Sequence, residues 1–322
     1  MAALCLMTVA CQNEKAVETQ AGVRTENLDT TAVAGTDFYQ FACGGWMKNN
    51  PLPAEFSRFG SFDKLAEDNR LQIQGLIEEL AAKENQPGSV AQKIGTLYRV
   101  AMDSVKLNND GAAPLKERLQ QIASVKEEKD LYYLLGEGAY VAVYVGADEK
   151  NSSMNAVQTY QIGLSMGERD YYLEDTENSK RIRTAFLAHV EKMYKLAGMD
   201  DATAKRGAAL VMDIETRLAK AYRSRTELRD PHANYNKMTM DEAKALCPTF
   251  GWDAFLAAMD FKDVKEIIIG QPASLQAAAE ILHTTPVADQ TLYLQWKAIS
   301  YAASMLSDEF AEENFRSEEH TS

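Results

Sequence analysis

The sequence predicts a mostly α-helical, multi-helix lobe with one small β-hairpin at about residues 139–165. Apolar residues recur at i, i+3, i+4 and i+7 through most of the chain, which is the period of an amphipathic helix. The period changes once. β-branched and aromatic residues alternate in 139–145 and again in 157–164, on either side of turn-forming residues 148–153. No repeat of fixed length occurs, so we expect one continuous lobe rather than two domains.

Each predicted helix depends on its own apolar stripe. Pro87 and Gly88 separate the first two stripes, and Thr239 with Glu242 forms a capping box that opens a later helix. Segment 264–270 is rich in Ile and stays ambiguous, with a strand as one interpretation. The stripes lie, in order, at residues 73–80, 90–105, 115–122, 131–135, 182–197, 211–221, 239 onward, 252–259, 275–282 and 292–310.

The two ends of the chain differ from the lobe at 36–315. Residues 1–11 form a short apolar, lipoprotein-like signal segment that lacks the usual basic start. It ends in Thr8-Val9-Ala10-Cys11, which is similar to a bacterial lipobox with Cys11 as the lipidated residue, although Thr8 stands where Leu is more usual. The alternative is a merely apolar, disordered N-terminus. Residues 12–35 are polar and without periodicity, which predicts a disordered tether. Residues 316–322 interrupt the helical pattern, and we interpret them as an artefactual tail, with an ordinary frayed C-terminus as the alternative.

The charge of the chain excludes some classes of partner. The formal net charge is −13, which repels nucleic-acid phosphates and anionic lipid. No apolar run reaches the roughly 18 residues that a membrane-spanning helix needs. We therefore expect no nucleic-acid partner, and membrane contact only through a lipid anchor on Cys11. This places the protein in the bacterial cell envelope, as a periplasmic or outer-membrane lipoprotein.

No motif with the spacing of a metal site is present. HExxH, in which two His one helical turn apart hold zinc and a Glu acts as general base, is absent, and so is a P-loop. No two of the four histidines lie within five residues of each other. His189 lies on an apolar stripe, where a hydrogen-bonded core histidine is the favoured interpretation. We expect neither a metal ligand nor a catalytic residue; the histidines are His189, His232, His283 and His320.

The most distinctive stretch is residues 37–63. It combines aromatic residues with Gly44-Gly45, two prolines, Arg58 and Asp63. Aromatic rings need a core to enter, while glycine and proline fix sharp backbone directions. One interpretation is a segment pinned onto a helical body by its rings, and the other is a binding role.

The same stretch carries a resemblance to a known family. DFYQFACGGW followed by SRFGSFD is similar to the start of the neprilysin and endothelin-converting-enzyme family of zinc metallopeptidases. The similarity covers roughly residues 37–315. Further matching segments are 163–164, 169–173, 215–219, 229–230 and 235–238.

The resemblance implies a fold and a function. Members of the family have two mainly helical lobes around a large cavity, and the N-terminal lobe restricts access so that oligopeptides rather than folded proteins are cut. The lobe that carries HExxH and binds zinc comes later in the chain. This sequence therefore looks like the non-catalytic N-terminal lobe alone, inactive by itself, with zinc as cofactor and oligopeptides as substrates of the full-length enzyme, and with the C-terminal catalytic lobe as its missing partner.

The resemblance also carries over two residues. In mammalian members of the family, the Arg that matches Arg58 reaches the substrate cavity and binds the carboxylate end of a short peptide, with the Asp that matches Asp63 nearby. The alternative is that Arg58 pairs with Asp63 to brace its loop. Cys43 matches a disulfide cysteine of animal members, but Thr36 replaces the second cysteine, so we expect a free thiol at Cys43.

A second function stays open. The same chain can be a non-catalytic lipoprotein that binds peptides or a protein partner through a concave helical surface. A reading frame that continues past Phe315 into HExxH would favour the enzyme, and a genuine stop codon would favour the binding protein.

Overall fold

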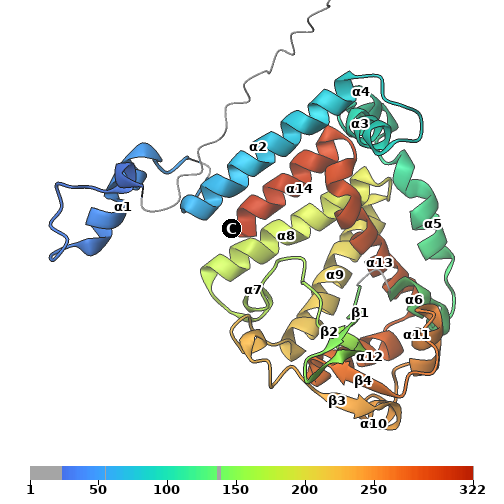
Figure 1. Cartoon of the computed structure of the whole chain (residues 1–322). Helices are drawn as coiled ribbons and strands as arrows, with labels where there is room; N and C mark the ends of the chain where they lie inside the picture. The colour runs from blue at the N-terminus through green and yellow to red at the C-terminus, as the bar shows by residue number, and fades with distance from the viewer. Residues whose placement is uncertain (1–23, 55, 136–138, 322) are drawn as a thin grey trace, which may run out of the picture. The chain divides into compact units, whose positions relative to one another are not determined.

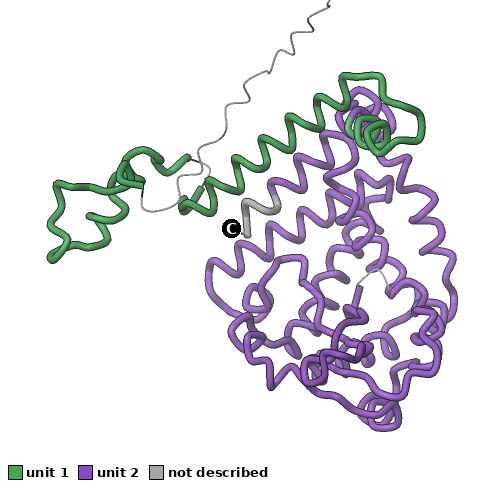
Figure 2. Tube along the Cα trace, in the orientation of Figure 1, with its two compact units in different colours: residues 1–98 green, residues 99–322 purple. Residues whose placement is uncertain are grey.

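The computed structural model describes residues 24–54, 56–135 and 139–321, with side chains as far as Arg316. The predicted signal segment, the lipidation site Cys11 and the first half of the tether lie outside the described residues. The chain divides into two compact units, one up to residue 98 and one from residue 99 onward (Figure 2). The lobe expected over residues 36–315 stays a prediction, and the two compact units have other bounds.

The described residues of the first unit form four helical elements (Figure 1). Part of the tether predicted over 12–35 is a short 3-10 helix, closed by a hydrogen bond from the N–H of Leu28 to the carbonyl oxygen of Thr25. Beside it, the carboxylate of Asp29 accepts hydrogen bonds from the backbone N–H of Thr31 (3.0 Å) and from Gln40 Nε2 (2.8 Å). The ordered chain therefore includes residues upstream of 36. The elements are η1 (Thr25–Asn27), α1 (Phe38–Asn49), α2 (Ser61–Ala82) and the greater part of α3 (Val90–Ala101).

Helix α2 confirms the stripe at residues 73–80 as a helix, but none of its residues is buried. Phe62 is 85% exposed and Leu76 is 61% exposed. Periodicity correctly predicts the helix, whereas the burial of its apolar face depends on a surface that packs against it.

Gly44 and Gly45 permit a close approach rather than a change of backbone direction. Both lie inside α1. A Cβ atom on Gly44 would lie 2.7 Å from the Cβ of Asp29, and one on Gly45 would lie 2.5 Å from the carbonyl oxygen of Glu26. Only glycine leaves room for the η1 segment to pack on this face of α1.

The second unit contains the hydrophobic core, which is built from residues between Leu115 and Phe310. Each apolar stripe predicted in this part of the chain falls on helical structure, although the helix over 211–221 begins at Asp201 and the stripe at 292–310 is divided between two helices. The helices are α4 (Ser104–Asp110), η2 (Ala113–Leu115), α5 (Lys116–Ser124), α6 (Glu128–Leu135), α7 (Asp170–Leu173), α8 (Glu177–Leu196), α9 (Asp201–Ala221), η3 (Glu227–Arg229), α10 (Met240–Leu246), α11 (Trp252–Ala258), α12 (Pro272–Thr284), α13 (Val287–Ala302), η4 (Ala303–Met305) and α14 (Asp308–Thr321).

The predicted hairpin is present as β1 (Ala142–Asp148) and β2 (Asn151–Tyr160), paired antiparallel. It belongs to a larger, four-stranded sheet with the order β1-β2-β4-β3 (Figure 1). The ambiguous segment 264–270 supplies β4 (Glu266–Ile269), which runs parallel to β2, and β3 (Lys237–Thr239) pairs antiparallel with β4. The apolar run of β4 is buried in this sheet, as a strand with partners on both sides requires.

Two stripes predicted as single helices are broken. The stripe at 90–105 is divided between α3 and α4, because the carboxylate of Asp103 accepts the N–H of Lys106 at 3.0 Å and starts a new helix. The stripe at 292–310 is divided between α13 and α14. There Asn108 of α4 accepts the N–H of Asp308 at 2.8 Å and donates to its carboxylate at 2.7 Å, which caps α14 from a distant part of the chain.

The central helices pack tightly. Helix α9 contacts α8, α12 and α13, and α14 contacts α8. A Cβ atom on Gly207 of α9 would lie 2.5 Å from the ring of Tyr194 of α8, whose hydroxyl donates to the carbonyl oxygen of Leu292 at 2.8 Å. Helix α14 runs on to Thr321, so its backbone stays helical through most of the predicted tail at 316–322. None of the helices in the described part of the chain combines the length and apolarity that a membrane span needs.

Candidate functional site

Arg58 lies in a loop that is fixed on both sides within the first unit. On one side, the ring of Phe59 stacks on Trp46 of α1 at 6.2 Å between centroids and meets Phe56 edge-on at 5.3 Å. On the other side, the carboxylate of Asp63 accepts the backbone N–H of Gly60 at 2.8 Å. The loop is therefore held by ring packing and by a helix cap, and not by Arg58 itself.

The structure separates the two residues carried over from the family. Asp63 is half-buried in the first turn of α2, where its carboxylate caps the helix and a negative charge is favourable. Arg58 is exposed, and among the described residues no hydrogen bond or ion pair joins it to Asp63 or to any other group. Its guanidinium donors are therefore available to an anion. The alternative of an Arg58–Asp63 pair that braces the loop is not what these contacts show.

A buried carboxylate organises the second unit. Glu215 of α9 is fully buried. Its carboxylate accepts the N–H of Ser165 at 3.0 Å, the hydroxyl of Ser165 at 2.7 Å and the hydroxyl of Tyr172, with the hydroxyl of Tyr293 at 3.3 Å. Lys297 lies 3.8 Å from the same carboxylate. This network joins the loop after β2 to α7, α9 and α13.

The sequence did not single out Glu215 as a buried group. The signal is nevertheless present, because Glu215 lies on α9 between the buried residues Ile214 and Leu218. A charge within an apolar stripe requires partners, since an unpaired buried carboxylate is costly. What the sequence cannot supply is the identity of those partners, which come from distant elements.

Two Arg-Asp pairs that are adjacent in the sequence, Arg169-Asp170 and Arg229-Asp230, act through separate contacts. Asp230 accepts the N–H groups of His232 (2.9 Å) and Ala233 (3.1 Å), which closes a turn and lowers the pKa of its carboxyl. Arg169 donates from Nε to the carbonyl oxygen of Ala219 at 3.2 Å, at the end of α9. No ion pair joins Arg169 to Asp170, or Arg229 to Asp230, within the ranges that the structure covers. Hydrogen bonds to the backbone therefore hold these loops.

The histidines whose side chains the structure describes do not gather around a common point. His189 is buried, lies 3.1 Å from Glu313 and packs edge-on against Trp296, as expected of a core histidine. His232 is in the turn of Asp230, and His283 is exposed in the last turn of α12. In the described part of the chain, no group of three or more His, Cys, Asp or Glu side chains is placed to hold a metal ion. The described residues thus do not fit a zinc ion.

The two body cysteines are free thiols in different surroundings. Cys43 of α1 is half-buried, and Cys247 at the end of α10 is buried. Burial raises the pKa of the Cys247 thiol to about 11. The free thiol expected at Cys43 is confirmed.

Comparison with known proteins supplies the family. The sequence profile of the N-terminal part of peptidase family M13 matches residues 34–322. The chain belongs to peptidase family M13. It is 30% identical to human endothelin-converting enzyme 1 over 324 residues, covering 95% of this chain and 41% of that protein. Human endothelin-converting enzyme-like 1 is 27% identical, with coverages of 94% and 41%.

Solved structures agree with this assignment. The zinc metalloprotease ZMP1 of Mycobacterium tuberculosis, in complex with an inhibitor, superposes with a TM-score of 0.80 at 25% identity, covering 93% of this chain and 47% of that one. PepO from Lactobacillus rhamnosis shares the fold, with a TM-score of 0.68 at 16% identity. The predicted resemblance to the neprilysin and endothelin-converting-enzyme family and the predicted fold class are both confirmed. The chain spans less than half the length of the relatives that it matches.

Proposed function

We propose that this chain is the N-terminal, substrate-restricting lobe of a zinc metalloendopeptidase that cleaves oligopeptides. Two findings support the proposal together: membership of peptidase family M13, and a match that covers 41% of human endothelin-converting enzyme 1 and 47% of ZMP1. Zinc is the proposed cofactor of the full-length enzyme, and its ligands are proposed to lie in a C-terminal catalytic lobe that acts as partner of this one.

Arg58 is proposed to bind the carboxylate end of a short peptide substrate. The support is physical: the side chain is exposed, has no partner among the described residues and projects from a loop fixed by Phe59 and Asp63. A guanidinium group is permanently charged and grips a carboxylate with two parallel hydrogen bonds. Asp63 acts by fixing the loop that presents Arg58, and so it contributes to binding through position.

Cys11 is proposed to anchor the protein in the bacterial cell envelope as a periplasmic or outer-membrane lipoprotein. The lipobox-like sequence before Cys11 supports this proposal. Replacement of Cys11 by Ala should move the protein from the membrane fraction to the soluble periplasmic fraction. An unchanged distribution would contradict a lipid anchor at this residue.

Two experiments test the enzymatic proposal. Sequencing of the DNA downstream of codon 315 should show an open frame that continues into HExxH. A genuine stop codon would instead favour the non-catalytic, peptide-binding lipoprotein. The 322-residue chain, supplied with zinc, should not hydrolyse an unstructured peptide, and chelator-sensitive hydrolysis would overturn the assignment of a non-catalytic lobe.

The role of Arg58 is tested in the full-length protein. Arg58→Gln should raise KM about tenfold for peptides with a free C-terminal carboxylate, while amidated peptides are unaffected. Arg58→Lys should retain part of the affinity. Lys64→Gln is a matched control, because Lys64 pairs with Asp68 on the surface of α2. Equal losses for acid and amide peptides would exclude a carboxylate contact.

A further inference from the structure

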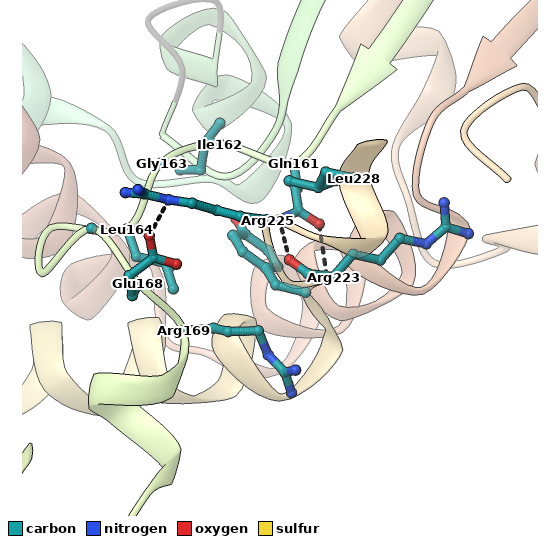
Figure 3. A pocket seen from close by; sticks show the side chains of 11 residues that line it. Gln161, Ile162, Gly163, Leu164, Glu168, Arg169, Arg223, Arg225 and Leu228 are labelled. Carbon is teal, nitrogen blue, oxygen red and sulfur yellow. Dashed lines mark hydrogen bonds and ion pairs between the residues drawn. The ribbon is translucent and has the colours of Figure 1, made fainter. Parts of the chain in front are cut away.

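A pocket of about 200 Å³ opens in the second unit (Figure 3). It forms where the loop after β2 meets the chain that leaves α9 and the short helix η3. A water molecule takes roughly 30 Å³ of liquid, so the pocket has room for several waters. A ligand of about one amino-acid residue fits the same space.

The walls of the pocket are fixed before any ligand binds. Gln161 and Arg223 exchange two hydrogen bonds of 3.0 Å, from Arg223 N–H to Gln161 Oε1 and from Gln161 Nε2 to the carbonyl oxygen of Arg223. Gly167 turns the loop with a φ of +81°, which favours glycine, and Ser165 of the same loop is bound to the buried Glu215. A ligand would therefore lose little affinity to ordering of the site.

The pocket carries an excess of positive charge in an otherwise acidic protein. Arg225 forms an ion pair with Glu168, and Arg223 donates to Asn234 at 2.7 Å. The terminal nitrogens of Arg169 have no hydrogen-bond or ion-pair partner among the described residues, because only its Nε is used, toward Ala219. In the view of Figure 3, Arg169 extends away from Glu168, while Arg225 reaches toward it.

The carboxylate of Glu227 lies near these arginines and interacts with their charge. The pKa of Glu227 is lowered mainly by its hydrogen bonds with Ser224, and further by Arg169 and Arg223. Its oxygen Oε2 is already engaged by the N–H and hydroxyl of Ser224, each at 2.8 Å. Arg225 is paired with Glu168, Arg223 donates to Asn234, and Glu227 is engaged by Ser224, which leaves Arg169 as the cation available to a ligand.

The remaining lining is apolar. Ile162, Leu164 and Leu228 contribute to the wall, together with Tyr222. A bare inorganic anion would use the arginine and leave this surface uncovered. A carboxylate that carries a short apolar group would use both.

We propose that the pocket binds a small apolar carboxylate, of the size of one C-terminal amino-acid residue, with Arg169 as its principal anion contact. The proposal does not depend on the peptidase assignment. It concerns a part of the chain separate from Arg58, and it is tested on this chain alone.

The test is a titration of the 15N-labelled 322-residue chain followed by NMR. N-acetyl-leucine should shift the backbone amide signals of Gly163 and Gly167 with a Kd on the order of 1 mM, and added salt should weaken binding. N-acetyl-leucinamide, which keeps the side chain without the charge, should bind at least about tenfold more weakly. Equal binding of acid and amide would overturn the proposal, and so would phosphate binding as tightly as the acid.

Variants locate the contact. Arg169→Gln should weaken binding of N-acetyl-leucine about tenfold, and Arg169→Lys should weaken it less. Arg181→Gln, at an exposed arginine of α8 outside the pocket, is the matched control and should leave binding unchanged. An unchanged affinity in folded Arg169→Gln would refute the role of Arg169. The comparison of acid with amide on the unmodified chain decides the proposal even where a variant does not fold.

Discussion

Ser165, in the loop that follows β2, donates two hydrogen bonds to the carboxylate of Glu215 on α9, from its N–H at 3.0 Å and from its hydroxyl at 2.7 Å. Trp296 of α13 in turn donates to the hydroxyl of Ser165 at 3.1 Å. A single buried carboxylate thus joins a loop to two helices that are far apart in the sequence. The loop also carries the wall of the pocket, so its position depends on Glu215.

Replacement of Glu215 by Gln should lower the free energy of unfolding by about 2–4 kcal/mol. The amide has nearly the same size, but its NH2 group is a donor and would face the N–H and O–H donors whose hydrogen bonds the carboxylate oxygen accepts. Lys297 would also lose its counter-charge. Urea unfolding followed by circular dichroism measures the change. Glu177→Gln is the control, because that side chain is 93% exposed, and equal midpoints for the two variants would show that the network contributes nothing.

Gly207→Ala should destabilise the second unit by about 1–2 kcal/mol, although alanine favours helices. The added methyl group would lie 2.5 Å from the ring of Tyr194, which is buried and held by Leu292. The same substitution at Gly75 of α2, where no atom lies within 4 Å, should stabilise by about 0.5–1 kcal/mol. Thermal unfolding of both variants tests the pair, and a gain in stability at Gly207 would show that α8 and α9 are not so closely packed.

The docking of α14 should weaken in acid through Glu313. Its carboxylate lies 3.1 Å from His189 and 2.5 Å from Lys192 of α8. Burial acts to raise the pKa of Glu313, but these two partners outweigh it, so the folded value lies below the ordinary 4.5. The unfolded chain therefore binds the proton more readily, and the stabilisation is present above about pH 4.5 and lost as the pH falls below it.

Glu313→Gln should remove this pH dependence. We expect it to cost about 1 kcal/mol at pH 6 and progressively less as the pH falls below 4.5, as measured by urea midpoints across that range. Glu309→Gln, at an exposed position of the same helix, is the matched control. A difference between wild type and Glu313→Gln that stays constant with pH would contradict the linkage.

The two body thiols should react at very different rates. At pH 8 the pKa of about 11 leaves Cys247 almost entirely protonated, and its side chain is buried, whereas Cys43 is partly accessible. Iodoacetamide should therefore alkylate Cys43 at least about tenfold faster, as measured by mass spectrometry of the cysteine peptides. Denaturation should remove the difference, and similar rates in the native protein would show that Cys247 is accessible.

Much of the fold follows from local pattern. The apolar stripes predict the helices, because apolar residues that recur every 3.6 residues form one face of a helix. This pattern can be read without knowing which element packs against that face. The capping box at Thr239 and Glu242 is found as predicted, with hydrogen bonds of 2.8 and 3.3 Å. The hairpin follows from residues that alternate over a short distance, and the motif at residues 37–63 indicates the family.

The sequence by itself therefore determined which segments are helical, where the hairpin lies and which family the chain belongs to, since each depends on residues close together in the chain. The tertiary structure decided the remainder. Asn108 caps α14 from 200 residues away in the sequence, and β4 becomes a strand by pairing with β2. Glu215 of α9 accepts a hydrogen bond from Ser165, which lies in the loop after β2. The physical reason is that folding brings these groups together from distant parts of the chain. Local periodicity does not indicate which distant group a residue will contact.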